Sequence, residues 1–170
     1  MRSRSRYITA SALLTAMGLI LGYIESFIVL PVRVPGVRIG LANLVGVVAL
    51  YLMGPLYALT ISVVRVILSA ILFSGFTGFI YSISGAIVSF IVMCLLKKYD
   101  FSVYSVCTGG AVSHNIAQIF IARFVVGSGY VFWYVPVLVI AGVAAGTVTG
   151  LLCDIIIKRL YNMFYERIDP

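Results

Sequence analysis

The polar side chains best suited to bind a ligand lie in one otherwise apolar stretch, residues 101–126. They are His114, the only histidine of the chain, its neighbour Asn115, and Gln118. On a helix, side chains three and four residues apart lie on one side, so these three share roughly one face. Polar side chains are costly in hydrocarbon and usually face a bundle interior or a cavity. The spacing therefore favours a neutral, hydrogen-bonding surface, and the alternative is a polar contact between two helices.

Arginines form a second candidate group. Arg33 and Arg38 flank a loop, whereas Arg65 and Glu25 each lie inside an apolar run. A charge in such a run must be paired or hydrated, so a Glu25–Arg65 ion pair is one interpretation. The other is a site open to the outside, because the planar guanidinium binds two phosphate or carboxylate oxygens at once. The predicted substrate-binding residues are Glu25, Arg33, Arg38, Asn43, Arg65, His114, Asn115 and Gln118.

The chain offers little for catalysis. It has no phosphate loop of the Gly-x-x-x-x-Gly-Lys-Ser/Thr type, which excludes ATP hydrolysis by that route. Its five acidic residues are scattered, whereas an enzyme that holds a diphosphate through magnesium needs clustered carboxylates. The three cysteines lack metal-ligand spacing and fit buried apolar positions. We therefore expect a binding protein and not an enzyme, with no metal, no cofactor and no catalytic residue.

The composition indicates an integral membrane protein. Hydrophobic residues make up 62% of the 170 residues and charged residues only 10%, with a mean hydropathy of +1.16. A water-soluble domain carries about 25% charged residues, so the polar surface that would cover such a domain is missing. Much of the net charge of +7 lies in clusters at the ends of apolar runs. That distribution is typical of topology signals and not of a nucleic-acid surface.

Helix breakers divide the chain into six apolar runs, and each run is interpreted as a membrane-spanning helix. Breaks are expected at a loop over 31–38, at Gly54-Pro55, at a turn over 74–78, at 97–100 and at a loop from Gly127. The predicted fold class is therefore all-α, with a single transmembrane domain over residues 1–170. The expected spans are about 7–29, 39–53, 56–73, 79–96, 101–125 and 135–157.

Six spans place both ends of the chain on one side of the membrane. Basic residues are enriched in cytoplasmic loops, so the side that carries more of them is the inside. With both termini inside, eight basic residues lie inside and three outside, namely Arg33, Arg38 and Arg123. We therefore expect cytoplasmic N- and C-termini, with the ligand site in the outer half of the bundle.

Small residues mark positions where helices approach closely, because lipid supplies no hydrophobic drive for helices to associate. Gly142, Gly146 and Gly150 line one face of the last span, and we expect that face to pack within the chain. Ala12 and Ala16 form a similar pair on the first span. For this pair, internal packing and a surface for a partner protein remain open alternatives.

Three motifs resemble one known family. They are Gly36-Val37-Arg38-Ile39-Gly40-Leu41-Ala42-Asn43-Leu44, the Arg65 helix followed by Phe73-Ser74-Gly75, and Ser113-His114-Asn115-x-x-Gln118. The pattern is similar, over nearly the whole chain, to the family called heptaprenyl diphosphate synthase component I, also known as the Gx transporter family. That family in turn resembles the substrate-binding S components of energy-coupling factor (ECF) transporters.

The resemblance implies an S-component-like bundle of six helices in the plasma membrane of a prokaryote. S components work with a transmembrane coupling subunit and two ATPases, and a small-residue surface on their first helix, which Ala12 and Ala16 match, contacts the coupling subunit. The expected function is to capture a small anionic, amphiphilic ligand from outside, such as an isoprenoid phosphate or a vitamin precursor. The alternative is an accessory membrane subunit of heptaprenyl diphosphate synthesis.

Overall fold

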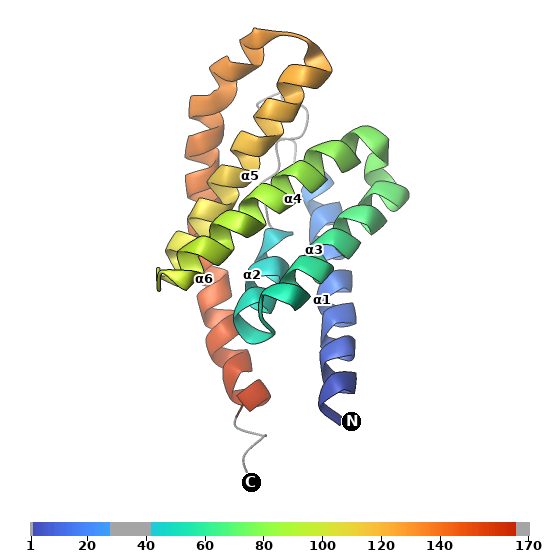
Figure 1. Ribbon diagram of the computed structural model, residues 1–170, viewed down its shortest axis with the longest axis vertical. Coiled ribbons are helices and arrows are strands. Elements are labelled where there is room, and N and C mark those ends of the chain that lie inside the picture. The colour runs from blue at the N-terminus through green and yellow to red at the C-terminus, as the bar shows by residue number, and fades with distance from the viewer. Residues whose placement is uncertain (1, 28–41, 166–170) are drawn as a thin grey trace.

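The described part of the chain is helical and holds no β-strand. The computed structural model describes residues 2–27 and 42–165. The helices follow one another through short connections (Figure 1). In order they are α1 (Arg2–Phe27), α2 (Asn43–Leu52), α3 (Pro55–Ser69), the π-helical turn η1 (Ala70–Ser74), α4 (Gly75–Lys98), α5 (Val103–Val126), the 3₁₀ segment η2 (Gly129–Tyr134) and α6 (Val135–Tyr165).

Three helical segments are long and apolar enough to cross a membrane, namely Ser5–Glu25, Pro55–Lys98 and Gly129–Tyr161. This finding confirms the prediction of a helical membrane protein. Helix α2 differs from the predicted span 39–53, of which residues 39–41 lie outside the described residues. With ten residues, α2 is about 15 Å long, whereas the hydrocarbon core is about 30 Å thick. The described part of this helix is therefore about half as long as the core is thick, and the span 39–53 stays a prediction.

Helix α2 forms the centre of the largest apolar core. Its residues Leu44–Leu50 and Leu52 are all buried, as expected of a helix that is hydrophobic on every side. Four other helices contribute buried side chains to the same core, among them Ile61, Met93, Val106 and Cys153. The short helix therefore joins α3 and α4 to α5 and α6.

Lys97, at the end of α4, fixes the C-terminal end of α2. Its ammonium group donates a 2.6 Å hydrogen bond to the Leu50 carbonyl oxygen and lies 4.7 Å from the centre of the Tyr51 ring. A cation near the last carbonyls of a helix satisfies an acceptor and interacts favourably with the helix dipole. Lys97 is one of the basic residues clustered at the ends of apolar runs, and it therefore also has a structural contact.

The chain reverses between α3 and α4 earlier than the sequence predicts. A turn is predicted over 74–78, but Gly75 and the three residues after it already belong to α4. The reversal is made by η1 and by Gly75, whose φ of +63° lies in the left-handed region that favours glycine. Helices α3 and α4 consequently meet in a sharp bend at the right of Figure 1. The prediction was wrong by about one helical turn, because Gly78 also looks like a breaker in the sequence.

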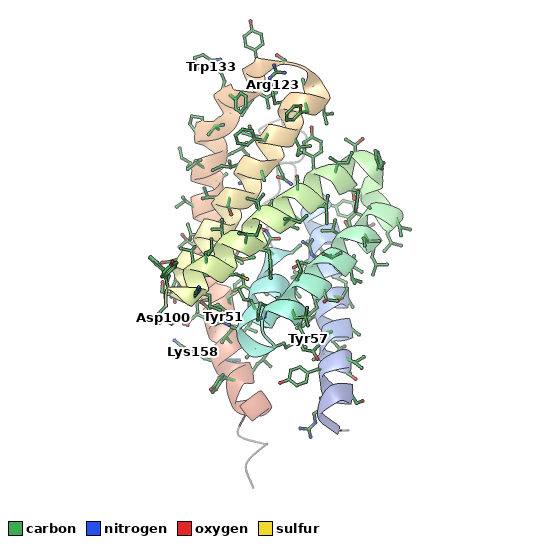
Figure 2. All side chains as sticks on the ribbon, in the orientation of Figure 1. Tyr51, Tyr57, Asp100, Arg123, Trp133 and Lys158 are labelled. Atoms are coloured by element: carbon green, nitrogen blue, oxygen red, sulfur yellow. The ribbon has the colours of Figure 1, made fainter. Side chains whose placement is uncertain are left out.

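The two ends of the bundle carry different side chains. Figure 2 places Trp133 and Arg123 at one end, and Asp100 and Lys158 towards the other. The predicted loop after Gly127 contains the 3₁₀ segment η2, in which Tyr130 and Trp133 are about four-fifths exposed. Exposed aromatic side chains at a bundle end are typical of a membrane–water interface.

Helices α5 and α6 approach most closely along the glycine row of α6. A Cβ atom at Gly146 would lie 2.5 Å from the Thr108 Cα atom, and one at Gly150 would lie 3.0 Å from the Tyr104 Cα atom. A Cβ atom at Gly142 would lie 3.1 Å from Val112 Cα. The three contacts repeat every four residues on both helices, so they form one continuous seam. The prediction that this row packs within the chain is confirmed.

We predict that Gly146→Ala destabilises the protein. The added methyl group would overlap the α5 backbone, which cannot move aside as a flexible side chain can, and overpacking of this kind costs about 1–3 kcal/mol. Thermal unfolding of the purified protein in detergent measures the effect. Gly129→Ala is the matched control, because no atom lies within 4 Å of a Cβ atom built there. An equal melting temperature for the two variants would contradict the seam.

Candidate functional site

Most of the predicted site residues are buried inside the bundle. Relative exposure is 4–6% for Glu25, Arg65, His114, Asn115 and Gln118. Asn43 is half-buried at the start of α2, and Arg33 and Arg38 lie outside the described residues. A buried charge or amide in an apolar bundle is costly unless it is hydrogen-bonded. The surroundings of each side chain therefore indicate what it does.

Arg65 lies between α1 and α2. Its Nη2 atom donates a hydrogen bond of 3.5 Å to Oδ1 of Asn43, so two predicted site residues from different helices meet. Its aliphatic stem crosses Gly18 of α1 so closely that a Cβ atom there would lie 2.7 Å from Arg65 Cδ. Glycine at position 18 thus gives the arginine room to remain inside the bundle.

Glu25 lies on the same face of α1 as this contact. Gly18, Gly22 and Glu25 are spaced four and three residues apart, so they line one side of the helix. All three are buried, and α1 packs against α2 and α3 along this region. The carboxylate and the guanidinium therefore belong to the same three-helix part of the bundle. A direct Glu25–Arg65 ion pair stays a prediction.

His114 faces α4. Three atoms of its imidazole ring would lie only 2.6–2.7 Å from a Cβ atom built at Gly85, so the ring occupies the space that a side chain there would fill. Gly85 and His114 are both buried. A glycine on one helix therefore makes room for the histidine of the other.

Asn115 faces α6 and not α4. Its Nδ2 atom donates a 3.0 Å hydrogen bond to the Leu138 carbonyl oxygen, and the amide also lies close to Gly142. The alternative of a polar contact between helices therefore holds for Asn115. The three polar side chains of α5 do not all face one neighbour, because consecutive residues on a helix point about 100° apart.

Three buried side chains carry polar atoms that lack a hydrogen-bond partner among the described residues. In the described part of the chain, no hydrogen-bond partner is found for either amide atom of Gln118, for the Tyr81 hydroxyl or for the Ser69 hydroxyl. Each of these residues is no more than 4% exposed. Native proteins leave few buried polar atoms unpaired, and such atoms call for an explanation such as a ligand.

Sequence reasoning missed Ser69 and Tyr81. Ser69 is four residues after Arg65 on α3, directly before the π-helical turn, so the helical spacing could have added it to the arginine face. Such π-helical turns are frequent at functional sites. Tyr81 gives no signal in the sequence, because it is one of 11 tyrosines and only the packing of α4 against α5 shows that it is buried.

The candidate site therefore has two parts of different electrostatic character. The first part holds the buried charged groups, Glu25 on α1 and Arg65 on α3. The second part offers hydrogen bonds without fixed charge, from Tyr81 on α4 and from His114 and Gln118 on α5. Among the described residues, no three side chains of histidine, cysteine, aspartate or glutamate gather where they could hold a metal ion. The arrangement is suited to non-covalent binding.

These features define a helical membrane protein that buries charged and amide side chains within its bundle. The chain belongs to the family described as heptaprenyl diphosphate synthase component I, whose family pattern it matches over residues 14–156. This match confirms the family resemblance that the motifs suggest. Comparisons with curated proteins and with solved structures gave no match.

We predict that Gly18→Ala disturbs Arg65 and lowers the melting temperature, whereas Gly22→Ala does not. The methyl group at 18 would overlap the arginine stem, and the net cost is expected to be about 1–3 kcal/mol. At Gly22 the nearest atom, Ala42 Cβ, is 3.7 Å away, which is an ordinary contact. Alanine also favours a helix over glycine by up to about 1 kcal/mol, so Gly22→Ala is expected to be neutral or stabilising.

Both variants are measured by thermal unfolding in the same detergent. Because they lie one turn apart on one helix, a general intolerance of α1 to substitution would affect both. Equal destabilisation of the two variants would contradict the close approach of Arg65 to Gly18.

Proposed function

We propose that this chain is a membrane-embedded binding subunit that captures a small anionic, amphiphilic ligand from outside the cell. The observation that carries the proposal is the buried guanidinium of Arg65, held by Asn43 and accommodated by Gly18 within an apolar bundle. An arginine so placed offers several donors to phosphate or carboxylate oxygens, and its desolvated position makes each such bond stronger than in water.

The amphiphilic character of the ligand follows from the surroundings of this arginine. The described helices around it are overwhelmingly apolar, so an anion with a hydrocarbon part suits both the charge and the walls. The family description names a prenyl diphosphate product, which combines those two properties. An isoprenoid phosphate is therefore the first ligand class to test, with an anionic vitamin precursor as the other. The proposed site also includes Arg33 and Arg38.

The proposed topology has six helices that cross or enter the membrane, with both termini in the cytoplasm of a prokaryote. The excess of basic residues on that side supports this orientation. It is also supported by the separation of Trp133 and Arg123 from Lys158 along the bundle in Figure 2. In this orientation Glu25, Ser69 and Gln118 lie in the outer half of their helices, which suits capture from outside.

The proposed importer needs partners, because this chain carries no ATP-binding phosphate loop. We propose that it works with an ECF-type transmembrane coupling subunit and its ATPases, and that it is not itself an enzyme. Ala12 and Ala16 are both exposed on α1, which makes them available to a partner helix. Small residues at such positions let two backbones approach closely.

A second candidate function is favoured by the family description. A component I of a heptaprenyl diphosphate synthase suggests an accessory membrane subunit that assists a separate catalytic subunit. The two functions share an isoprenoid phosphate ligand and differ in the partner. Partner identity therefore separates them.

We predict that Arg65→Gln weakens the binding of farnesyl diphosphate, used as the probe, roughly 10- to 150-fold. This range corresponds to the loss of one charge-assisted hydrogen bond, about 1.5–3 kcal/mol. Arg65→Lys is expected to retain part of the affinity, because it keeps the charge but not the planar fork. Binding is measured by titration of the purified protein, with thermal unfolding as the folding control.

Farnesol is the matched ligand control, because it has the same hydrocarbon chain and no anionic group. Its binding should be similar in the wild-type protein and in Arg65→Gln. Unchanged affinity of a stably folded Arg65→Gln variant for farnesyl diphosphate would remove Arg65 from the site and refute the anionic ligand.

We predict that the double variant Ala12→Leu, Ala16→Leu loses its partner subunits while it still binds farnesyl diphosphate. Two leucines hold the helix backbones apart and remove the close packing that drives association in lipid. Affinity purification from native membranes followed by mass spectrometry identifies what is lost. ATPases and a coupling subunit among the wild-type partners support the importer, whereas a soluble prenyl transferase supports the accessory role. Partner retention by the double variant would rule out this surface.

A further inference from the structure

Gln118 carries the least satisfied polar group in the described part of the chain. Its side chain is 4% exposed, and neither its amide oxygen nor its amide nitrogen has a hydrogen-bond partner among the described residues. Exchanging the two atoms by rotating the amide would leave the same deficit. A buried donor or acceptor that is left unpaired loses its hydrogen bonds to water without replacement, so this side chain reduces the stability of the empty protein.

Tyr81 lies at the matching level of the neighbouring helix. The His114 ring packs onto Gly85, which fixes the register between the antiparallel helices α5 and α4. Gln118 is one turn beyond His114 on α5, and Tyr81 is one turn before Gly85 on α4, so both lie on the same side of that contact. Tyr81 also shares a buried cluster with Ile119, the neighbour of Gln118. Its hydroxyl is likewise without a partner in the described residues.

The chemistry of this pair favours one kind of occupant over two others. A hydrocarbon chain would leave all three polar atoms unpaired, so it would not offset their cost. For an anion, the only cation of the described part of α5, Arg123, is five residues beyond Gln118 and therefore lies on another side of the helix. A neutral group that both donates and accepts hydrogen bonds matches the amide and the hydroxyl best.

We propose that Gln118 and Tyr81 form a second subsite that binds the edge of a neutral amide, lactam or imide. A primary amide presents a donor and an acceptor side by side, and it pairs with a group that carries an adjacent N–H and C=O. The Tyr81 hydroxyl supplies one further donor or acceptor to the same ligand. The subsite rests on the proposed binding function and adds a neutral, hydrogen-bonding requirement to the anionic one at Arg65.

The first test measures stability without added ligand. Gln118→Leu is expected to leave the melting temperature unchanged or to raise it, because an apolar side chain of similar size removes the unpaired amide. Asn115→Leu is the matched control on the same helix, since it removes the 3.0 Å hydrogen bond to the Leu138 carbonyl oxygen and should lower the melting temperature. If Gln118→Leu lowers the melting temperature as Asn115→Leu does, its amide has a structural partner and the proposal is overturned.

The second test measures binding with uracil as the probe, because uracil is neutral, planar and has adjacent N–H and C=O groups. Saturation-transfer NMR at millimolar uracil should show binding to the wild-type protein and roughly tenfold weaker binding to Gln118→Leu and to Tyr81→Phe. 1,3-Dimethyluracil, which lacks the N–H donors, should not bind. Absence of uracil binding to the wild-type protein, or equal binding to Gln118→Leu, would overturn the subsite.

The experiments distinguish a failure of the anionic site at Arg65 from a failure of the second subsite. Arg65→Gln should keep its uracil binding, because the arginine belongs to the other part of the site. Loss of farnesyl diphosphate binding in Arg65→Gln together with a negative uracil result would retain the proposed function and reject the second subsite. Uracil binding together with an unchanged farnesyl diphosphate affinity in Arg65→Gln would reject the anionic ligand and retain the subsite.

Discussion

The cost of burying polar atoms among apolar helices governs the arrangement of this protein. Three buried hydroxyl groups meet that cost locally: Thr15, Ser89 and Thr149 each donate to a carbonyl oxygen three or four residues earlier on their own helix. Asn115 meets it by bonding to α6. Because local solutions are so common, the polar atoms of Gln118 and Tyr81 that lack a partner within the described residues are informative. They are the basis of the proposed second subsite, because buried polar atoms without a partner call for an explanation.

Glycine serves two different purposes in this bundle. Along α6 it lets two backbones approach, as at Gly146, which nearly touches the α5 main chain. At Gly18 and Gly85 it instead makes room for a large polar side chain from the neighbouring helix, Arg65 in one case and His114 in the other. In lipid, where hydrophobic association is absent, close contact of either kind supplies the attraction between helices. The second kind also fixes the position of polar groups that belong to the proposed site.

The helical membrane class and the internal packing of the α6 glycines could be predicted from the sequence, because composition and a four-residue repeat report them directly. The pairing of Arg65 with Gly18 could not, since a lone glycine in a span gives no indication of which side chain covers it. The turn after α3 was misplaced because Gly75 and Gly78 look alike, and only the positive φ of Gly75 distinguishes them. Asn115 shows a similar limit, because spacing assigns a face to a residue but does not identify the helix opposite it.

Helix α1 contributes to both the proposed ligand site and the proposed partner surface. Its inward side carries Gly18, Gly22 and Glu25 against the arginine region, while Ala12 and Ala16 remain exposed. A continuous helix transmits a tilt or a shift along its whole length, because each residue is tied to the next turn by backbone hydrogen bonds. Any movement of Arg65 on ligand binding therefore acts on α1 through the contact at Gly18. In the proposed importer, this contact lets ligand binding shift α1 and with it the exposed alanines. The shift changes the affinity for the partner if the partner binds the shifted and the unshifted helix differently.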